Sequence, residues 1–185
     1  MEYISKYKDI FGLGDISSLT IFSVIIIITT LFVFKRVNNF YLISLLTLPG
    51  TFMHELMHLL ASFITFGKPT SFSIIPKKHN GGITLGSVSS ANVKWYNAII
   101  ISLAPLALYF IAYYLMKILP SIGNEAYYYA TLYFIANLLF AGTPSPTDWR
   151  LAFKKSWFLI VIIILGVVEY KFKIVGLESI IAKWL

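Results

Sequence analysis

Long apolar runs separated by short polar segments set the pattern of this chain of 185 residues. The runs are longer than a buried helix requires and approach the length of a bilayer span. The pattern therefore predicts an all-α polytopic membrane protein that forms a single domain, residues 1–185. About five transmembrane helices are expected, at residues 17–34, 40–66, 96–119, 126–142 and 149–168.

The segment between the second and third apolar runs has a different pattern. Residues 71–75 and 83–88 are short runs with strand-like character, and they flank the polar sequence Lys-Lys-His-Asn-Gly-Gly. Turn residues between two short strands are typical of a hairpin. We therefore expect a small β-hairpin between the second and third transmembrane helices.

Composition and charge agree with a membrane protein. The chain is 58% hydrophobic and only 12% charged. Its net charge of +7 is interpreted as basic loops beside membrane spans, so no nucleic acid is expected as a partner. With five spans, nine of the 15 Lys and Arg residues fall on one side of the membrane, which is therefore expected to be cytoplasmic. The predicted location is the cell membrane, with the lipid bilayer as a partner.

The second apolar run contains His54, Glu55 and His58 in the pattern H-E-x-x-H. Residues four apart share one face of a helix, so the two imidazoles can bind one metal ion. Glu55 lies to the side, where it can act as a general base on a metal-bound water. An ionisable group inside a membrane is costly and is functional by default. The chain has no cysteine, so the pattern predicts a Zn²⁺ site with nitrogen and oxygen ligands.

A catalytic zinc site needs a third protein ligand, and the predicted topology favours Asp148. Asp148 follows the fourth span on the same side as the two histidines, after two prolines that interrupt the helix. Glu125 and Glu169 fall at the opposite surface of the membrane. Asp15 is on the correct side and is interpreted as a helix cap. The active site is thus expected nearer the cytoplasmic side.

Three segments resemble the site-2 protease family of intramembrane zinc metalloproteases. They are His54-Glu55-x-x-His58 within a span, the glycine-containing "NGGITLGSV" followed by "SLAPLALYF", and "NLLFAGTPSPTDW". The third is longer than the corresponding family element and has Trp149 in place of the usual glycine, which suggests a small, divergent member.

The resemblance implies a zinc metalloendopeptidase that hydrolyses peptide bonds of transmembrane protein substrates. In this mechanism Zn²⁺ activates a water molecule and Glu55 is the general base. Asn137 is expected to stabilise the oxyanion, unless it forms a helix–helix hydrogen bond instead. The hairpin could present a strand edge to an extended substrate.

Two alternatives to this function stay open. One is a non-proteolytic membrane protein, either a transporter or a metal-binding partner protein. No pair of broken helices in corresponding halves supports a transporter, and a non-catalytic descendant would be expected to lose Glu55. The other is a zinc membrane protease of a different family, whose third ligand would be Glu125 or Glu169. The oligomeric state is also open.

Overall fold

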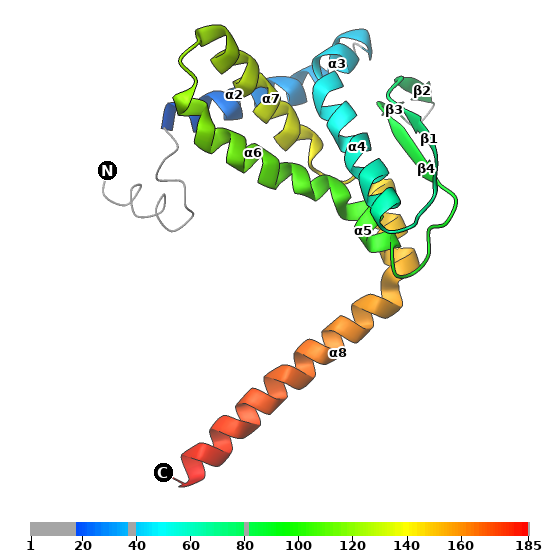
Figure 1. The fold of residues 1–185 in the computed structure, drawn as a ribbon, viewed down its shortest axis with the longest axis vertical. Coiled ribbons are helices and arrows are strands. Elements are labelled where there is room, and N and C mark those ends of the chain that lie inside the picture. The colour runs from blue at the N-terminus through cyan, green and yellow to red at the C-terminus, as the bar shows by residue number, and fades with distance from the viewer. Residues whose placement is uncertain (1–17, 37–39, 80–81, 185) are drawn as a thin grey trace.

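The computed structural model describes residues 18–36, 40–79 and 82–184 of the chain, which are mostly helical (Figure 1). The helices are α2 (Ser18–Arg36), α3 (Phe40–Leu46), α4 (Leu48–Ile64), α5 (Ala98–Leu103), α6 (Ala107–Ile118), α7 (Glu125–Ala141) and α8 (Pro146–Trp184). Short 3-10 turns, η1 (Ala104–Leu106) and η2 (Leu119–Ser121), follow α5 and α6. The strands are β1 (Pro69–Ser73), β2 (Lys77–His79), β3 (Gly82–Thr84) and β4 (Ser87–Ser90).

Helix α7 is the centre of the helical body. It packs against α2, α4 and α6, and the strands lie beside α4 on the outer side of this body (Figure 1). The main core cluster joins α2, α6 and α7 through fully or nearly fully buried side chains. These are Val24, Leu108, Ala112, Leu119, Leu132, Ile135, Ala136 and Leu138.

The second apolar run does not form one continuous helix. It breaks at Thr47, which lies between α3 and α4 and has φ −99° and ψ 3°. Pro49 follows within the first turn of α4, where a proline is tolerated because the missing N–H would have no intrahelical partner. The hydroxyl of Tyr133 on α7 donates a hydrogen bond to the Leu46 carbonyl at this break. Side-chain donation thus helps to satisfy the backbone where the helix is interrupted.

The predicted hairpin is present but is divided into two antiparallel pairs. Strand β1 pairs with β4, and β2 pairs with β3 nearer the tip. Part of the segment expected to be a polar turn, Lys77–His79, is therefore a strand. The turn from α4 into β1 is tight: Phe66 and Lys68 both have positive φ, at 57° and 53°, on either side of Gly67.

Helix α8 is bent after its third turn. Ser156 has non-helical angles, φ −108° and ψ 15°, and its hydroxyl donates to the Trp95 carbonyl at 2.7 Å. The neighbouring Lys155 donates to the Val93 carbonyl at 2.8 Å. These two bonds fasten the first part of α8 to the loop before α5, while the rest of α8 runs away from the body (Figure 1).

The prediction of about five transmembrane helices is wrong. Among the described residues, one helix is long and apolar enough to cross a membrane, Ala98–Ser121, with 24 residues. The bent pair Pro146–Phe158 and Val161–Lys171, which meet at 62°, would add at most one more. The other apolar runs fall short because α4 and α7 each have 17 residues and α3 has seven. The apolar stretch of α2, Thr20–Val33, is also too short.

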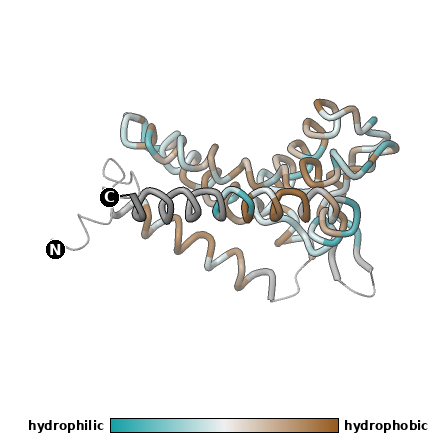
Figure 2. Tube along the Cα trace, turned by 90° about the horizontal axis from the view of Figure 1, so that it is seen from below, coloured by the Kyte–Doolittle hydropathy of each residue, from teal (hydrophilic) through white to brown (hydrophobic). Residues whose placement is uncertain are grey.

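Large apolar side chains nevertheless cover much of the outer surface of the described helices. Figure 2 shows hydrophobic residues along most of the described helices. Leu45 on α3, Ile64 on α4 and Phe110 on α6 are 68%, 76% and 70% exposed. Apolar side chains that gather on an outer surface are typical of regions that contact other molecules.

Candidate metal centre

Helix α4 places His54 and His58 one turn apart on the same face. Their Nε2 atoms lie 3.2 Å from each other, and both rings are largely buried. The i, i+4 spacing brings the two imidazoles together, as the sequence pattern predicts. Such a close approach of two ring nitrogens requires a positive charge or a shared proton between them.

Backbone carbonyls orient both imidazole rings through hydrogen bonds at Nδ1. His54 Nδ1 lies 2.6 Å from the Ala141 carbonyl oxygen, and His58 Nδ1 lies 2.7 Å from that of Ile101. A carbonyl can only accept, so each Nδ1 carries the hydrogen and donates it. In the neutral ring, Nε2 is then left with its lone pair facing the other histidine. This is the tautomer that a metal ligand needs.

Asp148 reaches the same point from the first turn of α8. Ser145 is the N-cap of this helix: its hydroxyl accepts from the Asp148 amide at 3.2 Å. In return, Asp148 Oδ2 accepts from the backbone N–H and the hydroxyl of Ser145, at 2.7 and 2.6 Å. This reciprocal arrangement is a capping box, and Pro146 occupies the first helical position. It fixes the carboxylate so that Oδ1 faces His58.

The three side chains form a compact group that could hold a metal ion. Asp148 Oδ1 lies 3.5 Å from His58 Nε2, and Asp148 Oδ2 lies 3.9 Å from His54 Nε2. All three potential ligand atoms lie within 4.8 Å of one another. In the part of the chain that the structure describes, no other group of three such side chains has this proximity. Glu125 and Glu169 are not in the group, and Asp15 is outside the described residues.

Electrostatics favour a positive charge within this group. Burial lowers the pKa of His58, but the neighbouring Asp148 stabilises the protonated ring and raises the pKa above its ordinary value overall. Burial raises the pKa of Asp148, but the hydrogen bonds from His58 and Ser145 outweigh this and hold it below its usual range. The pKa of His54 is lowered, chiefly by burial. Of the two histidines, His58 is thus the one whose protonated form the Asp148 carboxylate favours.

Glu55 lies beside the group, buried at 7% exposure. Burial raises the pKa of its carboxyl to about 7. The backbone of Gly86, just before β4, passes directly against it. A Cβ added at Gly86 would lie 2.6 Å from Glu55 Cγ and 2.8 Å from Glu55 Oε1. Only a glycine allows the strand segment to approach the carboxylate this closely.

Asn137 is fully buried on α7, one turn before Ala141. Its amide nitrogen donates to the Tyr133 carbonyl in the same helix at 3.2 Å, and its Oδ1 accepts no hydrogen bond from the described residues. Among the described residues, Asn137 thus does not form the helix–helix hydrogen bond that was the alternative to its role as an oxyanion donor. Its role as an oxyanion donor stays a prediction.

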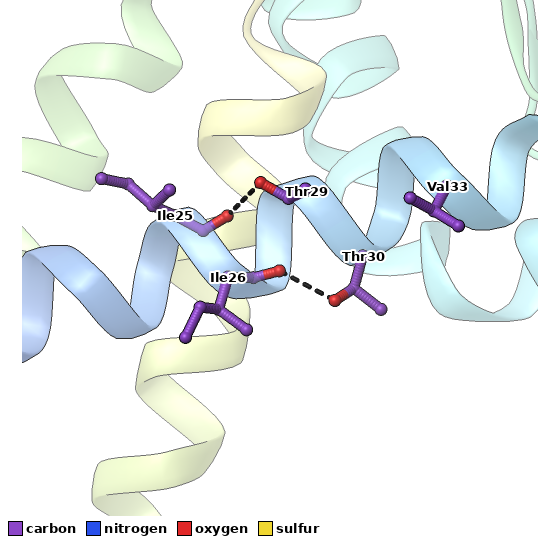
Figure 3. A pocket seen from close by; sticks show the side chains of 5 residues that line it. All are labelled: Ile25, Ile26, Thr29, Thr30 and Val33. Atoms are coloured by element: carbon purple, nitrogen blue, oxygen red, sulfur yellow. Dashed lines mark hydrogen bonds between the residues drawn. The ribbon is translucent and has the colours of Figure 1, made fainter.

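Two hollows lie on the surface of the described helices. One of about 360 Å³ follows α2, where the hydroxyls of Thr29 and Thr30 donate to carbonyls of their own helix, and it contains no ionisable group (Figure 3). The other, of about 440 Å³, lies along the first half of α4 and has an entirely apolar lining. It is formed by Leu48, Pro49, Phe52, Met53, Ile74 and Phe134.

Some of the groups that form the site cannot be predicted from the residue types along the sequence. The carbonyls of Ala141 and Ile101 orient the histidines, but every residue has a carbonyl, so no residue type reveals them. Ser145 could have been found, because Ser145-Pro-Thr-Asp148 has the spacing of a capping box.

No protein-family model, no curated protein and no solved structure matches the chain.

Proposed function

We propose that the chain is a zinc metalloendopeptidase that hydrolyses peptide bonds of membrane-embedded protein substrates. The observation that carries the proposal is the group of His54, His58 and Asp148, with both histidines oriented by backbone carbonyls. The two Nε2 atoms lie 3.2 Å apart, Asp148 Oδ1 lies 3.5 Å from His58 Nε2, and the three potential ligand atoms all lie within 4.8 Å of one another. A tetrahedral zinc ion with bonds of about 2.0–2.2 Å holds its ligands about 3.3–3.6 Å apart. The separation of the two Nε2 atoms and that of His58 Nε2 from Asp148 Oδ1 are close to this range.

The donor set favours zinc and a catalytic rather than structural site. Structural zinc sites are usually closed by four protein ligands, often cysteines, and this chain has no cysteine. Two imidazoles and one carboxylate leave a fourth position open. When bound, the zinc ion would supply Lewis acidity that polarises a water molecule and the scissile carbonyl.

The chain's own residues would perform the proton transfers. Glu55 accepts a proton from the attacking water and later returns it to the leaving nitrogen. Its burial excludes competing water, and the backbone at Gly86 restricts the positions of its carboxylate. Asp148 keeps Oδ1 toward the metal position because Oδ2 is occupied by Ser145.

Several features support a membrane-embedded substrate. The outer surface carries many exposed apolar side chains, and the helix Ala98–Ser121 is long enough to cross a bilayer. The apolar hollow along α4 could take apolar side chains of a substrate. Each two-stranded sheet also has outer edges that could pair with an extended peptide. The resemblance to the site-2 protease family supports the same substrate class.

Zinc content tests the metal site. We expect purified wild-type protein to contain one zinc ion per chain, measured by elemental analysis after dialysis. Asp148→Ala should lose affinity by more than the roughly 10–100-fold that outer-shell changes typically cost. Glu125→Ala and Glu169→Ala are matched acidic controls and should bind as wild type. Loss of zinc in either control, with retention in Asp148→Ala, would favour the glutamate-ligand alternative.

Glu55→Gln tests the activity. The variant should fold and bind zinc but cleave about 10²–10⁴-fold more slowly, because it keeps the shape of Glu55 and removes the base. The assay incubates the protein in liposomes with a set of single-span membrane proteins and detects fragments by mass spectrometry. Cleavage by Glu55→Gln at the wild-type rate would refute the peptidase proposal.

A further inference from the structure

Pro105 lies four residues after Ile101, whose carbonyl oxygen accepts from His58 Nδ1 at 2.7 Å. In an α-helix, a carbonyl bonds to the N–H of the residue four positions later. Proline has no N–H, so the Ile101 carbonyl has no α-helical donor at that position. The proline thus leaves an acceptor on the buried side of α5, where His58 can use it.

The local backbone is consistent with this role. Helix α5 ends at Leu103, and the chain passes through the 3-10 turn η1 before α6 begins at Ala107. Pro105 is fully buried within η1. His58 and Ile101 are also buried, so water cannot replace the bond between them without rearrangement. In a continuous helix, the N–H of residue 105 would bond to the Ile101 carbonyl and compete with His58 for it.

We propose that Pro105 is a positioning residue for the metal site: it frees the Ile101 carbonyl, which fixes the tautomer and orientation of His58. The inference rests on the proposed zinc site and adds a residue that does not contact the metal. Hydrogen bonds from the second ring nitrogen commonly set how a ligand histidine presents the first. The important property of Pro105 is therefore that it has no backbone N–H, and the shape of its ring is less important.

Pro105→Ala separates this role from a purely structural one. The new N–H can bond to the Ile101 carbonyl and straighten η1, so the carbonyl turns away from His58. Zinc affinity, measured by chelator competition, should fall about 10–100-fold. The thermal stability of the metal-free protein should hold or rise, because an interior proline disfavours a helix. A structural proline would give the opposite stability result.

Pro120→Ala is the matched control. Pro120 also lies in a 3-10 turn at the end of a helix, in η2, which is at the opposite end of α6 from η1. This variant should bind zinc as wild type. If wild-type protein binds no zinc, the proposed function fails together with this inference. Wild-type affinity in a folded Pro105→Ala variant would overturn this inference alone.

Nitrogen NMR of ¹⁵N-histidine-labelled wild-type protein tests the proposal without the variant. The chain has only three histidines, so His79→Gln leaves only the ring nitrogens of His54 and His58. We expect the His58 ring to carry hydrogen at Nδ1 with and without zinc. A neutral ring protonated at Nε2 alone in the metal-free protein would overturn the proposal, even if Pro105→Ala does not fold.

Discussion

Asp148 uses its two carboxylate oxygens for different purposes. Oδ2 belongs to the capping box that begins α8, and Oδ1 faces His58 at 3.5 Å. The helix start therefore orients the third potential ligand before any metal arrives. A preorganised carboxylate loses little side-chain entropy when it binds, which favours affinity.

Ser145→Ala should weaken zinc binding by about tenfold, the lower end of the range for outer-shell partners. The variant removes the hydroxyl bond to Asp148 Oδ2 and keeps the backbone bond, so the loss is partial. Chelator competition gives the affinity. Ser121→Ala is the control, since the Ser121 hydroxyl bonds only to the Ile118 carbonyl among the described residues and is exposed. Equal affinities of the two variants would contradict the orienting role of Ser145.

The ligand prediction illustrates what spacing can and cannot establish. The i, i+4 rule placed His54 and His58 together because helix geometry is local. Asp148 was chosen by its membrane side within a five-span topology that the structure contradicts. The structure nevertheless brings Asp148 to the histidines, through a helix start rather than a shared membrane depth. Long-range proximity depends on packing, which a single sequence does not encode in a readable pattern.

At the scale of elements, α4 and α7 approach closely one turn away from the metal site. A Cβ added at Gly50 would lie 2.5 Å from the Asn137 carbonyl oxygen and 3.0 Å from Ala141 Cβ. One turn further along both helices, His54 bonds to the Ala141 carbonyl. The glycine therefore sets the separation of two helices that share the site.

Gly50→Ala should destabilise the protein by about 1–3 kcal/mol, because the nearest obstacle is backbone and cannot rotate away. This result opposes helix propensity, which favours alanine over glycine. Thermal unfolding in detergent measures the difference. Gly123→Ala is the matched control, since nothing lies within 4 Å of its added Cβ. A Gly50→Ala variant as stable as the control would show that α4 and α7 can move apart without a loss of thermal stability.

Helix positions were predictable from the apolar runs, but their continuity was not. The observed α7, Glu125–Ala141, differs by only one residue at each end from the expected helix. In contrast, the run at residues 40–66 divides at Thr47, two residues before Pro49 in the first turn of α4. Hydropathy averages over such a break, because side chains on both sides stay apolar. The expected number of spans was therefore too high.

For the whole molecule, the arrangement of apolar surface leads to a prediction about the membrane. If Ala98–Ser121 crosses the bilayer, its two ends should face opposite sides. Single cysteines at Lys94 and Gly123, both exposed, report on these ends. We expect a membrane-impermeant thiol reagent to label one in intact cells and the other only after lysis. Labelling of both from the same side would show that this helix does not span the membrane.

The potential ligands come from distant parts of the chain, and this has a consequence for biosynthesis. The histidines on α4 are translated early, whereas Asp148 and the carbonyl of Ala141 follow much later. A growing chain that has not yet reached Ala141 offers a metal only two imidazoles, and His54 lacks its orienting carbonyl. The proposed peptidase would therefore stay inert while it is being inserted. The protein would become active only after it has been fully synthesised and the helices around α4 have assembled.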